Sequence, residues 1–399
     1  MGGALEGVKV ADFSWVGAGP RATKDLADNG ATVIKIESRK RLDLGRLSPP
    51  FKDDRPNPDG SAFFAQTNTS KQSVTVNLAD PRGVEVAKKL IAWADVVVEN
   101  FSKGFLDRLG LSFAQMQAIK PDIILVSVSV AGRTGPLADM RGYGNSAAAM
   151  SGQAALAGGT GQPPHMPPFA YGDVVAPIFA TIGALAALEH RACTGLGQHV
   201  DVSQVEPLMH TLADVFAERA ENLTAGGDGN RASGPAPHDA FPCRGHDQWC
   251  AIACETDGQW RKLCEVMWRP DLADAYPTAG RRKQAEDEIF TAVAAWTAGQ
   301  DKHQLAARLR GHGVPAGAVQ DGRDVFTDPE LLASGHYVRV VHPVMGASDM
   351  PAPPMRFSRS AITVGPAPLL GQHNVEVFCG LLGMDRSEVA ALEAAGALA

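Results

Sequence analysis

The sequence predicts an α/β fold, in which a large domain surrounds a parallel sheet and a smaller α+β domain follows it. Residues 8–37 have the pattern of a strand, a helix and a second strand, and such a unit places its two strands parallel. Strand and helix patterns then continue to alternate through residue 130. A Gly-rich stretch at 225–235 is the clearest break in composition, which is typical of a linker between domains.

The elements of the large domain, expected over residues 1–224, follow from hydrophobic periodicity and from the residues at their ends. Pro20 suits the first turn of the first helix, and Gly30 ends that helix. Ser203 and Glu206 have the spacing of a capping box at the start of a long helix. The strands are expected at 8–13, 32–37, within 69–83, and at 96–99, 122–130 and 199–202, and the helices at 20–29, 61–68, 81–93, 103–110, 112–118, 143–156, 174–188 and 203–222.

The remainder of the chain divides into two segments. Residues 225–330 are predicted to form the small α+β domain, and residues 331–399 form a linker and a C-terminal part. Within them we expect β structure around Trp249, helices at 259–267, 281–297 and 302–310, a strand at 337–342, a Pro-rich arm, and helices at 374–382 and 387–394.

Composition narrows the classes of function. The 399 residues are 45% hydrophobic and carry a net charge of −7, so nucleic acid and anionic membranes are poor candidates as partners. The N-terminus lacks a signal segment and the longest apolar run, 174–188, is short for a bilayer span, so we expect a cytoplasmic protein. The six cysteines lack paired spacing and the histidines are scattered, which favours buried reduced thiols and no metal site.

Asp173 stands at the start of the apolar run, after a Pro-rich loop. The simplest interpretation is a helix N-cap, because a carboxylate accepts hydrogen bonds from the free N–H groups of the first turn. The same N–H groups and the helix dipole would also keep the carboxylate ionised and oriented. An ionised, oriented carboxylate can act as a nucleophile, so the residues themselves leave both roles open.

Glycines at the first strand–helix turn indicate a second place for a ligand. Gly17 and Gly19 let the backbone approach a bound molecule closely. Together with Ala22 and Glu37 they weakly match a dinucleotide fingerprint, so a nicotinamide-dependent dehydrogenase is a minor alternative. Asn100 follows the strand at 96–99, and ligands of open α/β sheets bind at the carboxyl ends of strands.

Several motifs occur together and in order along nearly the whole chain. They are GVKVADFSWVGAGP, TSKQSVTVNL, DVVVENF followed by LDRLG, SVSVAGRTGP, YGD with ALEHRACTGLGQHVDVS, GVPAGAV, PPMRFS and APLLGQHN. This set resembles the class III CoA-transferases, the family of formyl-CoA:oxalate and carnitine CoA-transferases. The resemblance implies a Rossmann-like large domain that binds coenzyme A, a small domain inserted between its two parts, and an interlocked, ring-like homodimer.

The resemblance also assigns site residues by position. The family's catalytic aspartate falls on Asp173 of the YGD motif. The positions that contact coenzyme A fall on Val16, Gly17, Ala18, Val76, Asn77, Leu78, Asn100, Phe101, Arg108 and Ser129.

The implied reaction moves coenzyme A from an acyl-CoA to a free carboxylic acid, through an aspartyl anhydride and an aspartyl-CoA thioester. Coenzyme A is then a substrate, and no tightly bound cofactor or metal is implied. Members that act on oxalate-like acids carry Gln where this chain has Gly17, so the acid is left open. Arg133 and Arg141 are candidates for holding a second carboxylate, although exposure to solvent is the simpler role for isolated arginines.

A sister branch, the α-methylacyl-CoA racemases, keeps the aspartate and is the main alternative. Those enzymes pair it with a histidine in the loop that here reads AGRTGPLADMRGYGNS, which contains none. Racemisation needs a second acid or base at the α-carbon, so the transferase is preferred.

Overall fold

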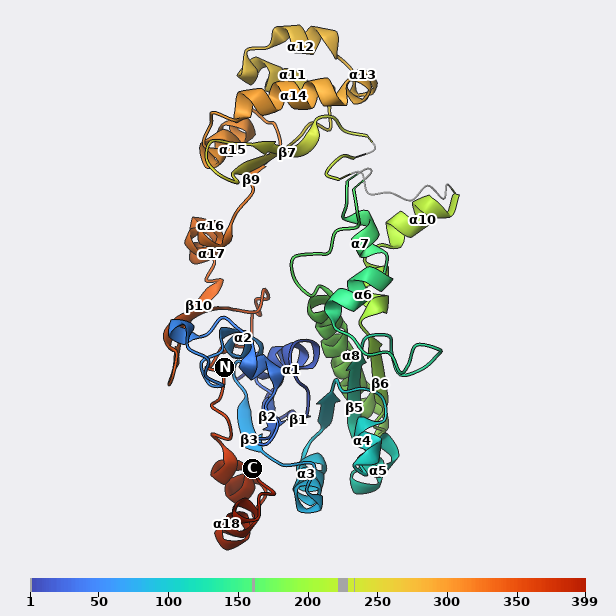
Figure 1. Ribbon diagram of the computed structural model, residues 1–399, viewed down its shortest axis with the longest axis vertical. Helices are drawn as coiled ribbons and strands as arrows, with labels where there is room; N and C mark the ends of the chain where they lie inside the picture. The colour runs from blue at the N-terminus through green and yellow to red at the C-terminus, as the bar shows by residue number, and fades with distance from the viewer. Residues whose placement is uncertain (1, 160–161, 222–228, 233) are drawn as a thin grey trace. The chain divides into compact units, whose positions relative to one another are not determined.

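The computed structural model describes residues 2–159, 162–221, 229–232 and 234–399 (Figure 1). The chain divides into two compact units. The first comprises Met1–Ala154, Met166–Leu223 and Ala333–Ala399, and the second comprises Ala155–His165 and Thr224–Leu332. The second unit also takes in residues 155–165, which the sequence had suggested belong to the large domain. The predicted linker at 225–235 lies partly outside the described residues.

Parallel strands form the centre of the first unit, in the order β3-β2-β1-β4-β5-β6 (Figure 1). All neighbouring pairs in this sheet run parallel, so the predicted α/β class is confirmed. β4 reads Val-Val-Val-Glu because a central parallel strand is buried on both faces. The strands are β1 (Lys9–Asp12), β2 (Thr32–Glu37), β3 (Gln72–Thr75), β4 (Val96–Glu99), β5 (Ile124–Ser129) and β6 (His199–Ser203).

Helices cover both faces of this sheet. The helices of the first unit are α1 (Ala18–Asp28), η1 (Leu44–Leu47), η2 (Lys52–Asp54), α2 (Ala62–Thr67), α3 (Pro81–Trp93), α4 (Phe105–Arg108), α5 (Phe113–Ile119), α6 (Gly144–Met150), α8 (Gly172–Thr194), α9 (Val205–His210), α10 (Ala213–Glu221), η3 (Glu376–Leu381) and α18 (Arg386–Ala394), and α7 (Gln153–Leu156) follows α6 in sequence. One face packs against α3, α5, η3 and α18, with Leu90 and Phe378 in the core. The other packs against α1 and α8, with Leu26 and Val126 in the core.

Helix α8 has 23 residues, so it is longer than the apolar run at 174–188 that the sequence predicts to be short for a bilayer span. By length and composition alone it could cross a membrane, and 39% of its apolar window is buried inside the protein. It lies against α1 and β5. The buried side presents Ala176, Ala180, Ala184 and Ala187, and small side chains in these positions let the helix approach its neighbours closely.

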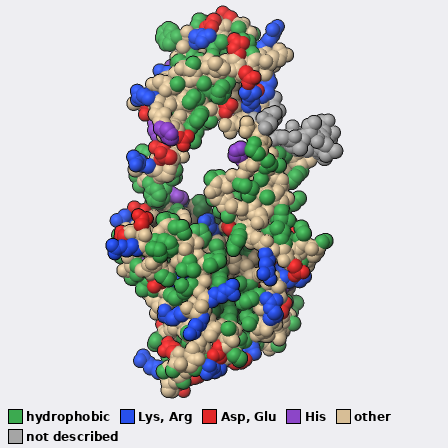
Figure 2. Space-filling view, viewed as in Figure 1, with side chains coloured by type: hydrophobic (Ala, Val, Ile, Leu, Met, Phe, Trp, Pro, Cys, Tyr) green, Lys and Arg blue, Asp and Glu red, His purple; other side chains and the backbone are tan. Residues whose placement is uncertain are grey.

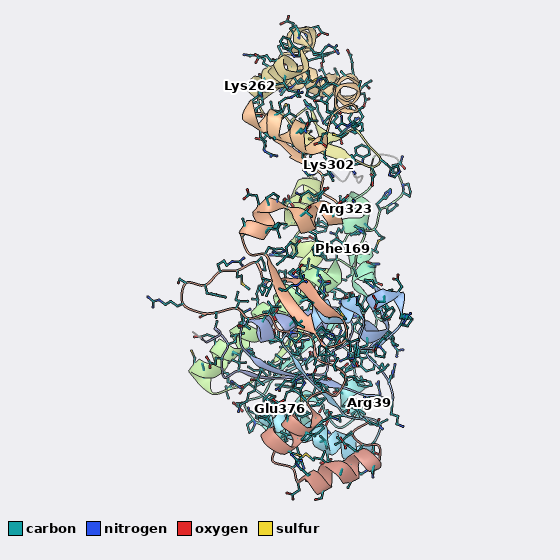
Figure 3. All side chains as sticks on the ribbon, turned by 90° about the vertical axis from the view of Figure 1, so that its left-hand side faces the viewer. Arg39, Phe169, Lys262, Lys302, Arg323 and Glu376 are labelled. Atoms are coloured by element: carbon teal, nitrogen blue, oxygen red, sulfur yellow. The ribbon has the colours of Figure 1, made fainter. Side chains whose placement is uncertain are left out.

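The C-terminal part returns to the first unit and covers the edge strand β3. Asn374 Oδ1 accepts from the Thr75 N–H at 2.9 Å, and the Asn77 N–H donates to the Ala397 carbonyl at 2.8 Å. Nε2 of Gln72 also donates to Oε1 of Glu376 at 2.9 Å, and Figure 3 labels Glu376 in the C-terminal part of the chain. An uncovered edge strand would offer unpaired N–H and C=O groups to other chains, so this closure protects the sheet.

Several predicted elements differ from the structure. The helices expected at 143–156, 203–222 and 281–297 are each broken into two, and at the first break Gly152 has φ of 89°. Ser203 Oγ does accept from the Glu206 N–H, but the helix begins at Val205. The Pro-rich arm contains a strand that we missed, because β10 (Tyr337–His342) forms an antiparallel hairpin with β11 (Gly346–Pro351).

The second unit contains an antiparallel sheet of order β7-β8-β9, made of β7 (His238–Pro242), β8 (Trp249–Ala253) and β9 (Ala316–Ala318). Its helices are α11 (Asp257–Met267), α12 (Pro270–Ala275), α13 (Ala279–Gln284), α14 (Glu286–Thr297), α15 (Lys302–Gly311), α16 (Gly322–Thr327) and α17 (Pro329–Ala333). Trp260 is buried in its core together with four cysteines, and burial raises the pKa of Cys254 and Cys264 to about 12. The prediction of buried thiols is confirmed for these four and is wrong for Cys193, which is exposed.

Charged side chains of both signs are spread over the face shown in Figure 2, whereas six others are buried beside β1, β2 and β3. These six form three ion pairs, which are Lys71–Asp12 at 2.9 Å, Lys35–Asp43 at 3.0 Å and Arg46–Glu37 at 2.7 Å. Burial alone would raise the pKa of Asp12, but the charges of Lys71 and Lys35 and two hydroxyl donors lower it to about 2.

Removing one partner of this network should destabilise the protein strongly. In Lys71→Met, Asp12 stays buried but loses its ion-pair partner, so we expect a loss of about 3–5 kcal/mol in the free energy of unfolding. Lys88→Met is the matched control, because its ion pair with Glu85 is exposed and should contribute less than about 1 kcal/mol. Urea unfolding curves measure both, and equal effects of the two substitutions would contradict the assignment.

Candidate active site

Asp173 lies in the first turn of α8, two residues further into the helix than the N-cap. The N-cap position is Tyr171, and the Asp173 carboxylate makes no capping bond to its own helix. Oδ1 instead accepts from Nε2 of Gln204 at 2.7 Å, and Oδ2 accepts from the N–H of Gly144 at 3.4 Å. The predicted capping role is therefore wrong, since the carboxylate is directed toward neighbouring elements.

The surroundings of Asp173 alter the chemistry of its carboxylate. Burial raises the pKa of Asp173 above its ordinary value of 3.8, while the bonds from Gly144 and Gln204 and the charge of Arg21 act in the opposite direction. Burial is the largest of these effects. A carboxylate that has lost part of its hydration is a stronger base and a better nucleophile than one in water.

Two glycines make room for this carboxylate. A Cβ at Gly17 would lie 3.2 Å from Cγ of Asp173 and 3.4 Å from Oδ2, so a side chain there would fill the space in front of Oδ2. A Cβ at Gly144 would lie 2.5 Å from the backbone nitrogen of Asp173, which no real side chain allows. The start of α6 can therefore meet the start of α8 only because residue 144 is glycine.

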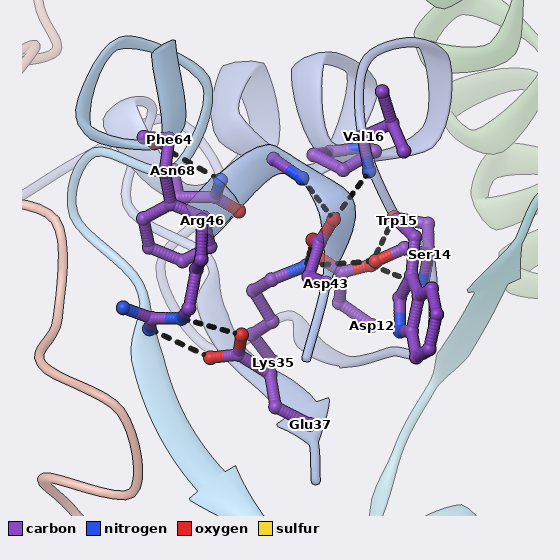
Figure 4. Close-up of polar contacts among 12 residues, drawn as sticks. Asp12, Ser14, Trp15, Val16, Lys35, Glu37, Asp43, Arg46, Phe64 and Asn68 are labelled. Atoms are coloured by element: carbon purple, nitrogen blue, oxygen red, sulfur yellow. Dashed lines mark hydrogen bonds and ion pairs between the residues drawn. The ribbon is translucent and has the colours of Figure 1, made fainter. Parts of the chain in front are cut away.

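The buried ion pair of Asp43 and Lys35 supports the loop that carries Gly17 (Figure 4). Val16 has φ of 65°, a left-handed conformation that a β-branched residue rarely adopts. Its N–H donates to Oδ1 of Asp43 at 2.9 Å, and the ion pair with Lys35 fixes Asp43 in turn. Lys35 Nζ also donates to the Ser14 carbonyl at 2.7 Å. Strain of this kind persists only where the surrounding contacts impose it.

Asn100 holds the same loop from the side. Its Oδ1 accepts from the Trp15 N–H at 2.7 Å, and its Nδ2 donates to the Trp15 carbonyl at 2.8 Å. The side chain therefore acts like a short strand beside the loop. This explains why a residue at the end of β4 belongs to the site even though it makes no contact with Asp173.

A cavity of about 470 Å³ opens beside Asp173. Five of the predicted contact residues line it, namely Val16, Gly17, Asn100, Phe101 and Ser129. A second cavity of about 370 Å³ is lined by the predicted Val76, Asn77, Leu78 and Phe101. The two cavities share Trp15, Arg41, Phe101 and Ser102, so they meet along a common wall.

Two predicted contact residues lie outside these cavities. Ala18 is buried at the start of α1 and packs in the core, and Arg108 is exposed on α4. Neither lines the wall of either cavity. Both assignments remain predictions, because no ligand is present to test them.

Sequence reasoning missed several residues that line the site, among them Trp15, Arg41, Tyr143 and Gln204. Gln204 could have been found, because it directly follows β6 as Asn100 follows β4, and both stand at the carboxyl edge of the sheet. Arg41 belongs to an irregular surface segment, where no periodicity marks a functional residue.

The two arginines that could hold a second carboxylate of the substrate differ in their contacts. Arg133 is paired with the buried Glu99 and also donates to the Phe101 carbonyl at 3.1 Å, so it supports the cavity wall. Arg141 is exposed and lines the cavity of Asp173. Arg141 is therefore the one of the two that lines the space where a substrate would bind, and it has no ion pair with a neighbouring acid among the described residues.

The alternatives to the transferase lose support in this geometry. Both carboxylate oxygens of Glu37 accept from Arg46, at 2.7 and 2.8 Å, so Glu37 is not free for the ribose of a dinucleotide. None of the described residues that line the cavity of Asp173 is a histidine, so that wall offers no imidazole as the second base of a racemase. Across the described part of the chain, no group of three or more His, Cys, Asp or Glu side chains could hold a metal ion.

Known proteins are similar to this chain in sequence and in fold. The profile of CoA-transferase family III matches residues 5–374. The formyl-CoA:oxalate CoA-transferase of Streptomyces avermitilis is 32% identical over 99% of each chain, and the succinyl-CoA:glutarate CoA-transferase of Mus musculus is 32% identical over 99% of this chain and 90% of its own. A CAIB/BAIF family protein from Brucella suis has a crystal structure that superposes with a TM-score of 0.88, at 30% identity, covering 96% of this chain and 100% of its own. The chain therefore belongs to CoA-transferase family III.

Proposed function

We propose that this CoA-transferase moves coenzyme A from an acyl-CoA to a free dicarboxylic acid, with Asp173 as the nucleophile that carries the reaction. The observation that carries the proposal is the partly desolvated Asp173 carboxylate, which has open space in front of Oδ2 and a cavity beside it. The relatives support the substrate class, because their names specify oxalate, glutarate and mesaconate as acids.

The proposed chemistry begins with attack of Asp173 Oδ2 on the thioester carbonyl of the donor. The C–S bond breaks, coenzyme A leaves as thiolate, and an acyl-aspartyl anhydride remains. The thiolate then attacks Cγ of Asp173, which releases the donor acid with Oδ2 and leaves an aspartyl-CoA thioester. The acceptor carboxylate displaces the thiolate from Cγ, and the thiolate attacks the new acyl group to give the product and free Asp173. Two easier attacks thus replace one difficult transfer for the donor acid, and two more do so for the acceptor acid.

The two cavities support a proposal for where the two ends of coenzyme A bind. We assign the nucleotide to the cavity of Val76 and Leu78, and the pantetheine arm and thioester to the cavity of Asp173. The shared wall of Trp15 and Phe101 supports this assignment, because an elongated ligand must pass from one cavity to the other. Arg41 lies in the same wall, where a guanidinium can pair with phosphate.

Arg141 is the proposed partner of the second carboxylate of the acid. It lines the cavity of Asp173, and no ion pair occupies it among the described residues. A guanidinium binds a carboxylate through two parallel N–H donors, which gives both charge and orientation. A monocarboxylic acid would leave this contact unused.

We further propose that the chain assembles as the interlocked homodimer of its family and acts in the cytoplasm. The exposed side of α8 supports the dimer, since Ile178, Ile182 and Leu185 form an apolar row that a second copy could cover. Light scattering coupled to gel filtration measures the assembly directly.

Replacement of the nucleophile tests the mechanism. In Asp173→Asn the side chain keeps its shape but cannot form an anhydride, so we expect CoA exchange between succinyl-CoA and glutarate or mesaconate to fall by about 10⁴-fold or more. Asp139→Asn changes an exposed acid outside both cavities and should keep full activity. Exchange that survives in Asp173→Asn would contradict the proposal, as would α-deuterium incorporation into a 2-methylacyl-CoA without any exchange of acids.

Replacement of Arg141 tests the substrate class. Arg141→Met should raise KM for a dicarboxylic acceptor by about 10- to 100-fold, because a hydrogen bond between charged groups is lost. KM for a monocarboxylic acceptor of similar length should not change, and it serves as the internal control. Steady-state kinetics with both acids measure the difference, and an equal effect on both would assign Arg141 a structural role instead.

A further inference from the structure

Gln204 lies beside Asp173, and only 5% of it is exposed. Its backbone N–H donates to the carbonyls of Ser129 and Val130, at 2.8 and 3.0 Å, so the end of the sheet fixes its position. Its side chain lines the cavity, and Nε2 donates to Oδ1 of Asp173 at 2.7 Å. The amide is therefore held rigidly against one oxygen of the carboxylate.

The oxygen end of the Gln204 amide shows that core packing alone does not account for a glutamine at this position. Oε1 of Gln204 is buried and has no hydrogen-bond partner among the described residues. A buried polar atom without a partner lowers stability, and an apolar side chain of the same length would avoid that cost. Turning the amide over would set Oε1 against the carboxylate oxygen of Asp173, so the observed orientation is the one the site enforces.

The two oxygens of Asp173 have different surroundings. Oδ1 has the short bond from Gln204, whereas Oδ2 has only the long bond from Gly144 and lies next to Gly17. Oδ2 is thus the freer oxygen and the one placed to attack the donor. In the proposed function, on which this inference rests, Oδ2 leaves with the donor acid while Oδ1 stays bonded to Cγ throughout.

We propose that Gln204 is a catalytic residue, which stabilises negative charge on Oδ1 each time Cγ of Asp173 is attacked. When the thiolate adds, the S–Cγ bond forms and an electron pair moves from the carbonyl to Oδ1. Collapse then restores the carbonyl and breaks the Cγ–Oδ2 bond, so the donor acid leaves as a carboxylate. The same charge develops on Oδ1 when the acceptor carboxylate displaces the thiolate. A preorganised donor aimed at such an oxygen is an oxyanion-hole contact.

The first step differs from the later ones in a way that can be measured. Attack of Oδ2 on the donor thioester places the negative charge on the donor's own carbonyl oxygen, which Gln204 does not touch. Loss of Gln204 should therefore slow the attacks on Cγ and spare formation of the anhydride. The acyl-aspartyl anhydride, normally short-lived, should then accumulate.

Gln204→Met tests this assignment, because it keeps the length of the side chain and removes the donor. With succinyl-CoA, we expect formation of the aspartyl-CoA thioester to slow by about 10²-fold while the anhydride accumulates. Rapid acid quench and intact-protein mass spectrometry distinguish the two adducts, since one adds the acyl group and the other adds coenzyme A. Gln204→Asn withdraws the amide by one methylene and should behave in the same way. Gln153→Met is the matched control, because Gln153 also has an unpartnered Oε1 but lines neither cavity.

The pH dependence gives a second measurement. The bond from Gln204 lowers the pKa of Asp173, so its loss should move the acid limb of kcat/KM to higher pH. The cations around the carboxylate, Arg21 on α1 and Arg41 and Arg141 in the cavity wall, stay in place in these variants.

Two results would overturn the inference. Equal slowing of both adducts, or no slowing of either, would mean that Gln204 does not act on the attacks at Cγ. Absence of any Asp173 adduct in the unsubstituted protein would instead remove the proposed function, and the inference with it. The unsubstituted protein therefore distinguishes the two failures.

Discussion

The site depends on the close approach of the loop at Gly17 to the first turn of α8. A Cβ at residue 17 would lie 3.2 Å from Cγ of Asp173 and 3.4 Å from Oδ2, which is a tight contact, so the lack of a side chain at Gly17 leaves open space in front of Oδ2 in this chain. The loop reaches this position through a strained Val16, which the buried Asp43 and Lys35 hold in place. The buried ion pairs thus position a piece of backbone, a role that does not require a net gain in stability, since the desolvation of buried charges offsets much of their attraction.

Burial gives the Asp173 carboxylate its reactivity and also creates a difficulty. Loss of hydration raises the pKa of Asp173, which favours attack on a carbonyl but disfavours the ionised form that attacks. Hydrogen bonds from Gly144 and Gln204 and the charge of Arg21 offset part of this effect. Because these donors are fixed before the substrate arrives, they need not reorganise as charge moves during the reaction.

Much of the architecture could be predicted from the residues, because each strand of the parallel sheet is an apolar run between clear turn signals. β2 and β4 were placed at their observed ends, whereas long helices were predicted where Gly152 and turns at 211–212 divide them. The motif around Asp173 pointed to the correct part of the fold, but local chemistry suggested a cap that the structure does not contain. Arg141 was a candidate from the sequence, and Gln204 could have been one from its place after β6, but their contacts could not be predicted, since these depend on which strand ends and loops meet in space.

The central claim is that Asp173 itself carries the acyl group and coenzyme A in turn. Exchange with a free acid labelled with ¹⁸O in its carboxylates tests this directly, because the acceptor leaves one of its oxygens on Cγ when the product acyl-CoA departs. After turnover and proteolysis, mass spectrometry should find one heavy oxygen in the peptide that contains Asp173. A peptide that stays unlabelled while acyl-CoA product accumulates would contradict the account.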